Sequence, residues 1–296
     1  MLCHKQSILI PLVIAFCGVN VALAGEIRGT IASTLNITED SWLTGDVTCR
    51  VDGAPCIQAA ASNLTIFLNG FSMTGQADPP AGCFPGGVGA NTEHGILITG
   101  QRRVEVFGPG VIQRFRGQGV LLTGTATRIT LKDFTISTNC NSGVLVGGSD
   151  NDLEGLVAVR NGNRESPCGG VCISGGNFNR VRWGVFGGNG YAVTATTNFG
   201  IGLLGTARGN IIERNTVTGN VNGIFLQPGV IETLVFNNIV SGNPPIQIPL
   251  SVESFLGFDI RNQAAEGANT FHGNSCATYS GAGAPPCPSI ISVIRR

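Results

Sequence analysis

Apolar and polar positions alternate along this chain in a pattern that repeats. In residues 209–226, GNIIERNTVTGNVNGIFL, the pattern N-x-I-x-x-N-x-V-x-x-N sets Ile212 and Val217 among three asparagines, and a second apolar run follows. The first pattern returns 23 residues later, where Asn243 takes the place of Asn220. Alternation over so few positions, bounded by Asn and Gly, predicts two short strands and two corners in each repeat.

Further repeats follow the same order with unequal lengths. The asparagines that close them are 22, 28, 31 and 23 residues apart. They are Asn139, Asn161, Asn189, Asn220 and Asn243. A column of Gly followed by Ile or Val runs in phase with them, and no helical pattern or L-x-x-L-x-L frame is present. A drifting period of this length is typical of a solenoid with inserted loops, and we predict a parallel β-helix.

Side chains that alternate along stacked strands predict two interior files. The first contains Val106, Leu131, Leu153, Val181, Ile212 and Val235, and the second contains Val111, Ile136, Ala158, Phe186, Val217 and Val240. The segment 63–75, NLTIFLNGFSMTG, is expected to open the repeat, with Leu68 in the first file and Met73 in the second. We expect the closing asparagines to form a structural ladder at a corner, because Asn tolerates left-handed backbone and its amide can bond the next coil.

The N-terminal segment predicts export. Residues 1–24 combine His4 and Lys5, an apolar run and the ending Ala-Leu-Ala, which is typical of a secretory signal cleaved before Gly25. No later stretch has the length and apolarity of a membrane-spanning helix. We expect residues 25–296 to form one β-helix of roughly eight to nine coils with capped ends. Its expected parts are an N-terminal cap (25–60), the coils (61–275) and a C-terminal cap (276–296).

Composition agrees with stacked short strands. Charged residues make up 12% of the chain, against roughly 25% in average proteins, and 44 residues are glycine. The loss of Lys5 with the signal leaves 17 of the 18 basic residues against 18 acidic ones, a net charge of −1. This balance gives no electrostatic footprint for nucleic acid, so we expect no nucleic-acid partner.

Eight of the ten cysteines remain after signal removal. An even number in an exported chain predicts disulfides. We expect the local pairs Cys49–Cys56, Cys168–Cys172 and Cys276–Cys287. Cys83 and Cys140 are left either to bridge to each other or to stay free. Zinc at Cys168 and Cys172 is disfavoured because no histidine lies nearby.

Charged side chains are expected to gather on one outer face. Asp152 and Glu154 point outward from one strand, with Lys132 one coil below and Arg180 and Arg182 one coil above. Two interpretations are open. The charges form a cross-strand ladder that contributes roughly 0.2–1 kcal/mol of stability per pair, or they form a site on the protein that takes an acidic polysaccharide.

The repeats resemble the right-handed parallel β-helix repeats of the pectate-lyase-like superfamily. The segment NLTIFLNGFSMTG is similar in particular to the opening coil of the periplasmic NosD-like and carbohydrate-binding, sugar-hydrolase group. The resemblance covers roughly residues 60–275 and implies a right-handed solenoid, as the crossover rule also does. It leaves function open, because members include polysaccharide lyases, glycosidases, epimerases and adhesins.

For the charged face, the resemblance implies a lyase-like arrangement. A lyase on a uronic polysaccharide needs a base and a cation or metal that neutralises the carboxylate. Lyases of this superfamily commonly place Lys or Arg beside an acidic calcium site. By that likeness Lys132 and Arg182 are candidate catalytic residues, Arg180 is a candidate substrate ligand, and Asp152 and Glu154 are candidate Ca²⁺ ligands. No complete family motif is present.

Other candidates lie outside this group. Glu93-His94-Gly95 matches only the last piece of the polygalacturonase pattern N-T-D, D-D and G-H-G, so His94 is either a general base or an ordinary loop residue. The exposed aromatics expected to stack on sugar rings are Phe107, Trp183 and Tyr191, although Trp183 has the alternative role of capping the outer wall.

Three functions follow from these observations. The first is a secreted or periplasmic protein that binds or processes a polysaccharide or cell-surface glycan, in particular one that contains uronic acid. If it is an enzyme, it would be a polysaccharide lyase, glycosidase or epimerase. The second is a non-catalytic structural or adhesin-type β-helix. The third is a NosD-like accessory factor. The sequence lacks His- or Met-rich metal ligation for that role, because Met73 is the only methionine left after processing. Oligomeric state is left open.

Overall fold

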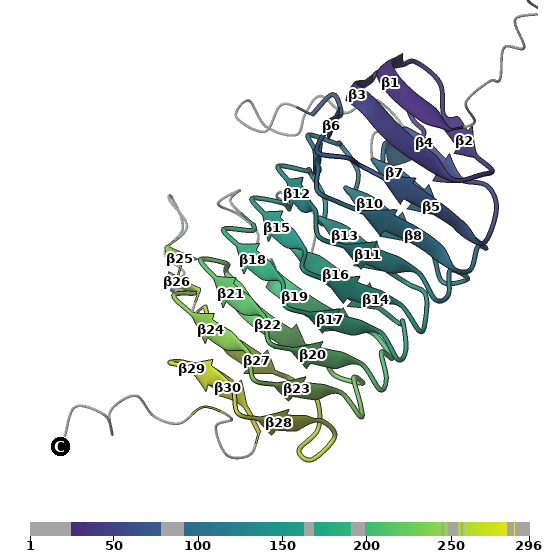
Figure 1. The fold of residues 1–296 in the computed structure, drawn as a ribbon. Coiled ribbons are helices and arrows are strands. Elements are labelled where there is room, and N and C mark those ends of the chain that lie inside the picture. Colours follow the sequence, from purple (N-terminus) through teal and green to yellow (C-terminus); the bar gives the residue numbers. More distant parts are fainter. Residues whose placement is uncertain are drawn as a thin grey trace, which may run out of the picture.

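A column of stacked coils makes up the molecule (Figure 1). The computed structural model describes residues 25–77, 92–162, 169–190, 199–243, 246–247, 254–255, 257–282 and 287. The predicted signal segment, residues 1–24, and the predicted disulfide candidate Cys83 lie outside these ranges. Within them, no helix is long and apolar enough to span a membrane.

Each coil contributes three strands, which form three walls. The first wall is a ten-stranded sheet. Its strands are β2 (Leu35–Ile37), β4 (Ile57–Ala59), β7 (Ile96–Ile98), β10 (Val120–Leu122), β13 (Val144–Val146), β16 (Val171–Ser174), β19 (Phe199–Leu204), β22 (Asn222–Leu226), β27 (Ile260–Asn262) and β30 (Tyr279–Gly281).

The other two walls belong to an 18-stranded sheet that is joined through the long strand β3. It begins with β1 (Glu26–Ile31) and β3 (Ser41–Cys49). The second wall contains β5 (Leu64–Phe67), β8 (Val104–Phe107), β11 (Thr130–Lys132), β14 (Asp152–Glu154), β17 (Arg180–Arg182), β20 (Ile211–Glu213), β23 (Leu234–Phe236) and β28 (Thr270–His272). The third contains β6 (Ser72–Thr74), β9 (Val111–Gln113), β12 (Thr135–Ser137), β15 (Val157–Val159), β18 (Val185–Gly187), β21 (Thr216–Thr218), β24 (Ile239–Ser241) and β29 (Ser275–Cys276).

Every strand pair in these walls is parallel, and only the small pair β25 (Ile246–Gln247) and β26 (Ser254–Phe255) in the described chain is antiparallel. Complete coils run from β4–β6 to β27–β29, which makes eight. The chain is therefore a right-handed parallel β-helix, as the repeats predicted.

Alternation places one side chain of each short strand inside. Leu131, Leu153 and Val181 are at most 1% exposed and lie in register on successive coils. The next strand of each coil adds a second buried file, in which Ile136 and Ala158 are fully covered. These files are continuous along the column, so the core is a stack of like residues rather than a globular centre.

The predicted register is wrong at two positions near the N-terminal end. Ile112, not Val111, aligns with Ile136, because the corner between β8 and β9 holds one more residue than the corners that follow. Ile66, not Leu68, aligns with Val106, because the corner after β5 is longer again. The apolar spacing in the sequence does not encode these corner lengths.

The predicted asparagine ladder is present and fully buried. Asn139 donates from Nδ2 to Asn161 Oδ1 at 2.8 Å, and the pattern continues through Asn189 and Asn220 to Asn243. The backbone N–H of each asparagine donates to the same oxygen of the next. The ladder therefore satisfies buried polar groups on every coil and fixes how neighbouring coils align.

Two further ladders line other corners. Asn151, Asn179 and Asn210 form one, with amide contacts of 2.9 and 3.1 Å. Asn215 starts the other, which continues to Asn238 at 3.0 Å and beyond. Asn215 is thus structural, but it belongs to a different ladder from Asn220.

Disulfides join residues near both ends of the column. Cys49 is bonded to Cys56 and Cys276 to Cys287, with Cα–Cα distances of 5.7 and 5.2 Å, and both are the expected local pairs. Cys172 is also disulfide-bonded, while its predicted partner lies outside the described residues. Cys140 is disulfide-bonded as well, so it does not stay free. These bonds indicate folding in an oxidising compartment.

Replacing one rung tests the ladder. In Asn189→Ala the backbone N–H and Nδ2 of Asn161 lose their acceptor, and Ala158 O loses its donor. Each buried group left unpaired costs about 1–3 kcal/mol, so we expect a loss of about 3 kcal/mol or more in the free energy of unfolding, measured by urea titration. The exposed Asn36 on β2 is the control, and Asn36→Ala should stay within about 0.5 kcal/mol.

Candidate functional site

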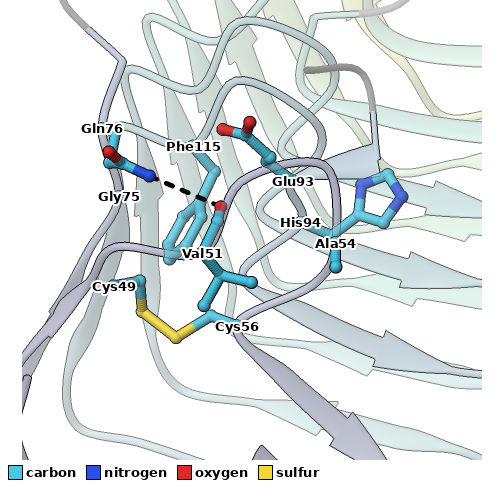
Figure 2. Close-up of a pocket in the computed structure, with 9 residues that line it drawn as sticks. All are labelled: Cys49, Val51, Ala54, Cys56, Gly75, Gln76, Glu93, His94 and Phe115. Carbon is cyan, nitrogen blue, oxygen red and sulfur yellow. Dashed lines mark hydrogen bonds between the residues drawn. A yellow bond between two sulfur atoms is a disulfide. The ribbon is translucent and has the colours of Figure 1, made fainter. Parts of the chain in front are cut away.

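His94, the candidate base, lies beside a cavity too small for a sugar. The cavity has a volume of about 10 Å³ and lies next to the Cys49–Cys56 disulfide, with Glu93 and His94 in its lining (Figure 2). That volume holds a single water at most. No larger substrate fits between these residues as they are placed here.

The contacts of this pair are structural. Glu93 is buried, meets Arg116 at 3.0 Å and accepts from the Gly53 N–H at 3.1 Å. His94 accepts the Gln118 N–H on Nδ1 at 3.2 Å. Burial lowers the pKa of His94 to about 4, against the smaller opposing effect of a hydrogen bond with the Gln118 side chain. None of these partners belongs to the predicted charged face, so the structure does not bring His94 and that face together.

The predicted charged face does assemble, on the outer side of the second wall. Lys132 on β11 lies in register with Glu154 on β14, which is followed by Arg182 on β17. Asp152 and Arg180 pair in the same way at the other outward position. We call the following set the charged ladder: Lys132, Asp152, Glu154, Arg180, Arg182, Glu213 and Arg214.

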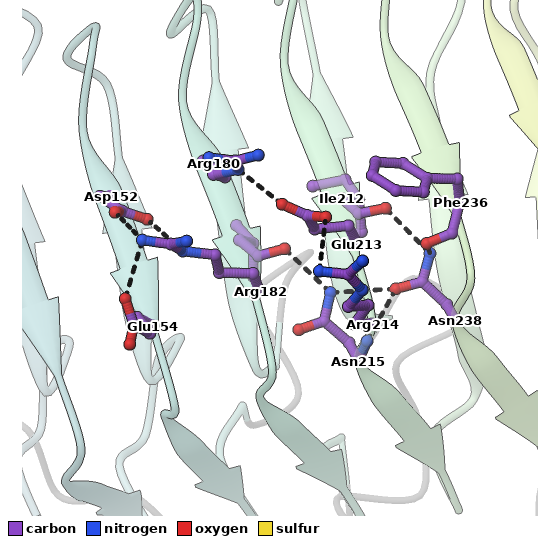
Figure 3. Close-up of polar contacts among 11 residues, drawn as sticks. Asp152, Glu154, Arg180, Arg182, Ile212, Glu213, Arg214, Asn215, Phe236 and Asn238 are labelled. Carbon is purple, nitrogen blue, oxygen red and sulfur yellow. Dashed lines mark hydrogen bonds and ion pairs between the residues drawn. The ribbon is translucent and has the colours of Figure 1, made fainter.

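Ion pairs connect these side chains, and Figure 3 shows the ones that join β14, β17 and β20. Lys132 Nζ lies 2.8 Å from Glu154 Oε1. The other carboxylate oxygen of Glu154 lies 2.8 Å from Arg182 Nη2. Arg182 also donates from Nε and Nη2 to the two oxygens of Asp152, at 3.2 and 2.7 Å. This fork is the strong, directional form of an Arg–carboxylate contact. One arginine therefore joins both carboxylates of β14.

Glu213 belongs to the charged ladder, although no role was predicted for it from the sequence. Its side chain is 4% exposed, and its Oε1 lies 2.6 Å from Arg180 Nε. Its second oxygen is 3.8 Å from Arg214 Nη1. In the sequence Glu213 follows the inward-facing Ile212, which predicts an outward position, but burial of its carboxylate under two arginines is visible only in three dimensions.

The ladder keeps its cations charged. The hydrogen bond and charge of Glu154 raise the pKa of Lys132. Burial alone would lower the pKa of Arg182, but the hydrogen bond and charge of Asp152, with Glu154 and Glu213, outweigh it and raise the pKa. Both groups are therefore cationic at neutral pH, and neither is poised to accept a proton.

In most of these pairs the cation is the exposed partner. The side chain of Lys132 is 37% exposed against 17% for Glu154, and Arg180 is 42% exposed against 4% for Glu213. Arg214 is 52% exposed over the same buried Glu213. Asp152 is the exception, being more exposed than Arg182. Although the charges nearly balance, the surface offered to a ligand is mainly positive.

The predicted calcium ligands do not fit a calcium ion in this arrangement. Ca²⁺ takes six to eight oxygen ligands, whereas Asp152 and Glu154 supply two carboxylates whose four oxygens already face Arg182 or Lys132. Among the described residues no group of three or more His, Cys, Asp and Glu is placed to hold a metal. Calcium binding by Asp152 and Glu154 stays a prediction.

Two of the predicted aromatics lie beside the ladder. Phe107 lies in register with Lys132 on the preceding coil. Its ring centroid is 5.7 Å from that of Phe67. Trp183 is 46% exposed and carries the Arg182 guanidinium 4.6 Å from its ring centroid. Tyr191 lies outside the described residues. Trp183 thus has a partly exposed ring beside two cations, Arg182 and Arg214.

Trp183 has an unusual backbone for its size. Its φ is 53°, in the left-handed region, and the corresponding corner of neighbouring coils has Gly155 before it and Arg214 and Asn237 after it. Gly and Asn adopt this conformation easily, while a bulky residue there is an outlier. Phe178, at the opposite end of β17, shares the same features with φ 55° and 58% exposure, and the sequence analysis missed it.

Comparison with known proteins supports the fold. Tailspike protein 2 from Escherichia coli O157:H7 bacteriophage CAB120 aligns with a TM-score of 0.56 and 11% identity, over 88% of this chain and 38% of that one. A periplasmic alginate epimerase, AlgG, aligns with a TM-score of 0.56 and 10% identity, over 88% and 70%. Dettilon tailspike protein aligns with a TM-score of 0.50 and 14% identity, over 86% and 54%. No family model and no curated protein matches the chain.

These likenesses and the strand pairing define the class of the protein. It is a protein with the right-handed parallel β-helix fold, which confirms the fold that the repeats predicted. This chain spans 38% of the phage tailspike, so the activity of that whole protein does not transfer with the fold. The finer likeness to the NosD-like group stays a prediction.

Trp183 can be tested for a structural role. Trp183→Gly should relieve roughly 1–2 kcal/mol of left-handed strain and remove a cation–π contact of roughly 0.5–1 kcal/mol. We expect the free energy of unfolding to change by less than about 1 kcal/mol. The other tryptophan, half-buried Trp42 on β3, is the matched control, and Trp42→Gly should cost roughly 2 kcal/mol or more. A large loss in Trp183→Gly would show that the ring holds the wall together.

The buried His94 predicts a pH dependence of stability. Its folded pKa of about 4 lies below the ordinary 6.5, so the unfolded chain binds more protons between these values and stability falls as pH drops from 6.5 towards 4. The full shift corresponds to roughly 3 kcal/mol. In His94→Gln this part of the slope should disappear, measured by urea unfolding at pH 7 and 4.5. The same substitution at the exposed His272 is the control, and an unchanged slope in His94→Gln would contradict the assignment.

Proposed function

We propose that this protein is an exported β-helix that binds an acidic, uronic-acid-containing polysaccharide on the charged ladder. One observation carries the proposal: Lys132, Arg180 and Arg214 are the exposed members of ion pairs whose carboxylates lie beneath them. Exposed cations held in place from below match a ligand that carries a carboxylate on successive sugars.

The ladder is built for orientation as well as charge. The pair of contacts from Arg182 to Asp152 and the contact from Arg180 to Glu213 restrict long, flexible side chains. A ligand that meets restrained cations loses less conformational entropy on binding than one that must order them. Parallel pairing spaces the rungs at roughly 4.8 Å along the column, which offers a polymer repeated contacts rather than one pocket.

Binding is favoured over lyase chemistry by the state of the candidate base. A lyase needs a group that accepts a proton, but the pKa of Lys132 is raised by Glu154, and Arg182 stays charged. His94 does not contact the ladder. Polysaccharide processing therefore has less support than binding.

Export is supported by several observations together. The disulfides Cys49–Cys56 and Cys276–Cys287 are typical of an oxidising compartment such as the periplasm or the exterior. The similar structures include a periplasmic epimerase and phage tailspikes. The predicted signal at residues 1–24 points the same way.

The test measures binding and chemistry in one set of samples. The mature protein is titrated with polygalacturonate, alginate and a neutral glucan, with and without Ca²⁺, while ultraviolet absorbance reports unsaturated products. We expect binding to the two polyuronates alone and no new absorbance. Unsaturated products would show that the protein is a lyase and not only a binding protein. No binding across the panel would favour a purely structural β-helix. A requirement for Ca²⁺ would revive the calcium prediction.

Substitutions place the binding on the ladder. Lys132→Ala and Arg180→Ala should each weaken polyuronate binding by about threefold to tenfold at low salt, and the loss should shrink at high salt because exposed charges are screened. Arg28→Ala is the matched control, since Arg28 is exposed on β1 and lies outside the ladder. Equal losses in all three variants would mean that binding follows overall charge and not this face.

A further inference from the structure

Strand β17 is bracketed by two exposed aromatic side chains. Phe178 lies just before the strand and Trp183 just after it, at 58% and 46% exposure. Between them Val181 is buried, whereas Arg180 and Arg182 point outward. The sequence FNRVRW thus presents two aromatic rings at the ends of a pair of cations.

Both aromatics occupy corners where the backbone is left-handed. The corner before the strand is held in the neighbouring coils by Asp150 and Gly209, and the corner after it by Gly155 and Arg214. These residues correspond because each donates its backbone N–H to the following coil in the same way. Among the described coils only this one has aromatics at both corners. A bulky residue at positive φ is unfavourable and is retained where the surroundings or a function require it.

The next coil supports both rings. A Cβ at Gly209 would lie 2.6 Å from a ring atom of Phe178, so the Phe178 ring lies against that glycine. The Arg214 guanidinium lies 6.0 Å from the centroid of Trp183, on which Arg182 also packs at 4.6 Å. The two rings are therefore held in place while much of their surface stays open to solvent.

The arginine side chains between the rings stay partly exposed, at 42% for Arg180 and 20% for Arg182. Arg180 contacts Glu213 through Nε at 2.6 Å. An exposed guanidinium fork matches a carboxylate in two-point contact. Aromatic faces take the apolar faces of rings, so the combination fits a chain of acidic sugars.

We infer that one acidic glycan chain lies along β17, within one coil and crosswise to the column, with a sugar on Phe178, a sugar on Trp183 and a carboxylate on Arg180. This inference rests on the proposed function and adds the direction of the chain and its two end contacts. The two aromatics are five positions apart in the chain, so their Cα atoms lie at most about 18 Å apart. A monosaccharide reaches one ring, whereas an oligosaccharide reaches both.

The alternative direction makes a different set of contacts. A glycan that ran down the column would follow outward-facing residues of the second wall that lie in register on successive coils. These run from Phe67 and Phe107 through Lys132 towards Phe236. Trp183 and Phe178 would lie to the sides of such a chain. Phe67 is 39% exposed and lies four coils away from β17. It is therefore the residue that separates the two directions.

The experiment measures the affinity of oligogalacturonates and alginate oligosaccharides of increasing length by calorimetry. Phe178→Gly and Trp183→Gly are used because glycine occupies the same corners in adjoining coils. With chains long enough to reach both rings, each variant should lose about fivefold to tenfold in affinity, and Phe67→Gly should bind like the unaltered protein. With the shortest chains, at least one of the two bracket variants should bind normally. Phe178→Asn and Trp183→Asn replace any variant that fails to fold, since Asn237 occupies a left-handed corner.

The outcomes separate this inference from the function on which it rests. If the unaltered protein binds, Arg180→Ala weakens binding and both bracket variants bind normally, then the bracket is overturned and the proposed function stands. A loss in Phe67→Gly comparable to that in Trp183→Gly would show a chain that runs down the column, which also overturns the bracket. A loss in only one bracket variant at every length would remove the two-point contact. If the unaltered protein binds none of the oligosaccharides or polyuronates, both proposals fail.

Discussion

Buried amide ladders are the interaction on which the rest of this structure depends. The side chain and backbone of Asn161 both bond the oxygen of Asn189, and the same arrangement repeats on the next coil. A shift of one residue would leave several buried donors without acceptors, each at a cost of about 1–3 kcal/mol. Register is therefore held far more strongly than by apolar contacts alone, and outward residues inherit this fixed alignment. The approach of Lys132 to Glu154 and Arg182 is a consequence of it.

The ladders also constrain the corners. A coil that must close within a few residues and still present its asparagine inward needs left-handed residues at defined places, such as Asp133 and Gly155. Small or polar residues meet this requirement at little cost. The presence of Phe178 and Trp183 in such places therefore has no explanation in the closure of the coil. Their exposure beside two arginines is the observation on which the proposed ligand contact rests.

Much of the fold could be predicted from the sequence because its causes are local and repeated. The interior file through Leu131 and Ile212 and the ladder through Asn220 follow from alternation and spacing. The displacement of Val111 by Ile112 could not be predicted, since the length of one corner does not alter the apolar pattern. Burial of Glu213 and His94 was equally hidden, because it depends on which neighbours cover them in space.

Separation of inward from outward positions decides how a site can arise on this column. Within β17, Val181 serves the core while Arg180 and Arg182 face solvent one residue away. Exchanging an outward side chain leaves the core and the amide ladders untouched, so binding and stability respond to different residues. The exception is a buried outward group such as Glu213, whose removal would release Arg180 as well as lose a covered ion pair. A binding face on this solenoid is thus free to vary only where its charges are exposed, and the cations of the charged ladder meet that condition better than its carboxylates.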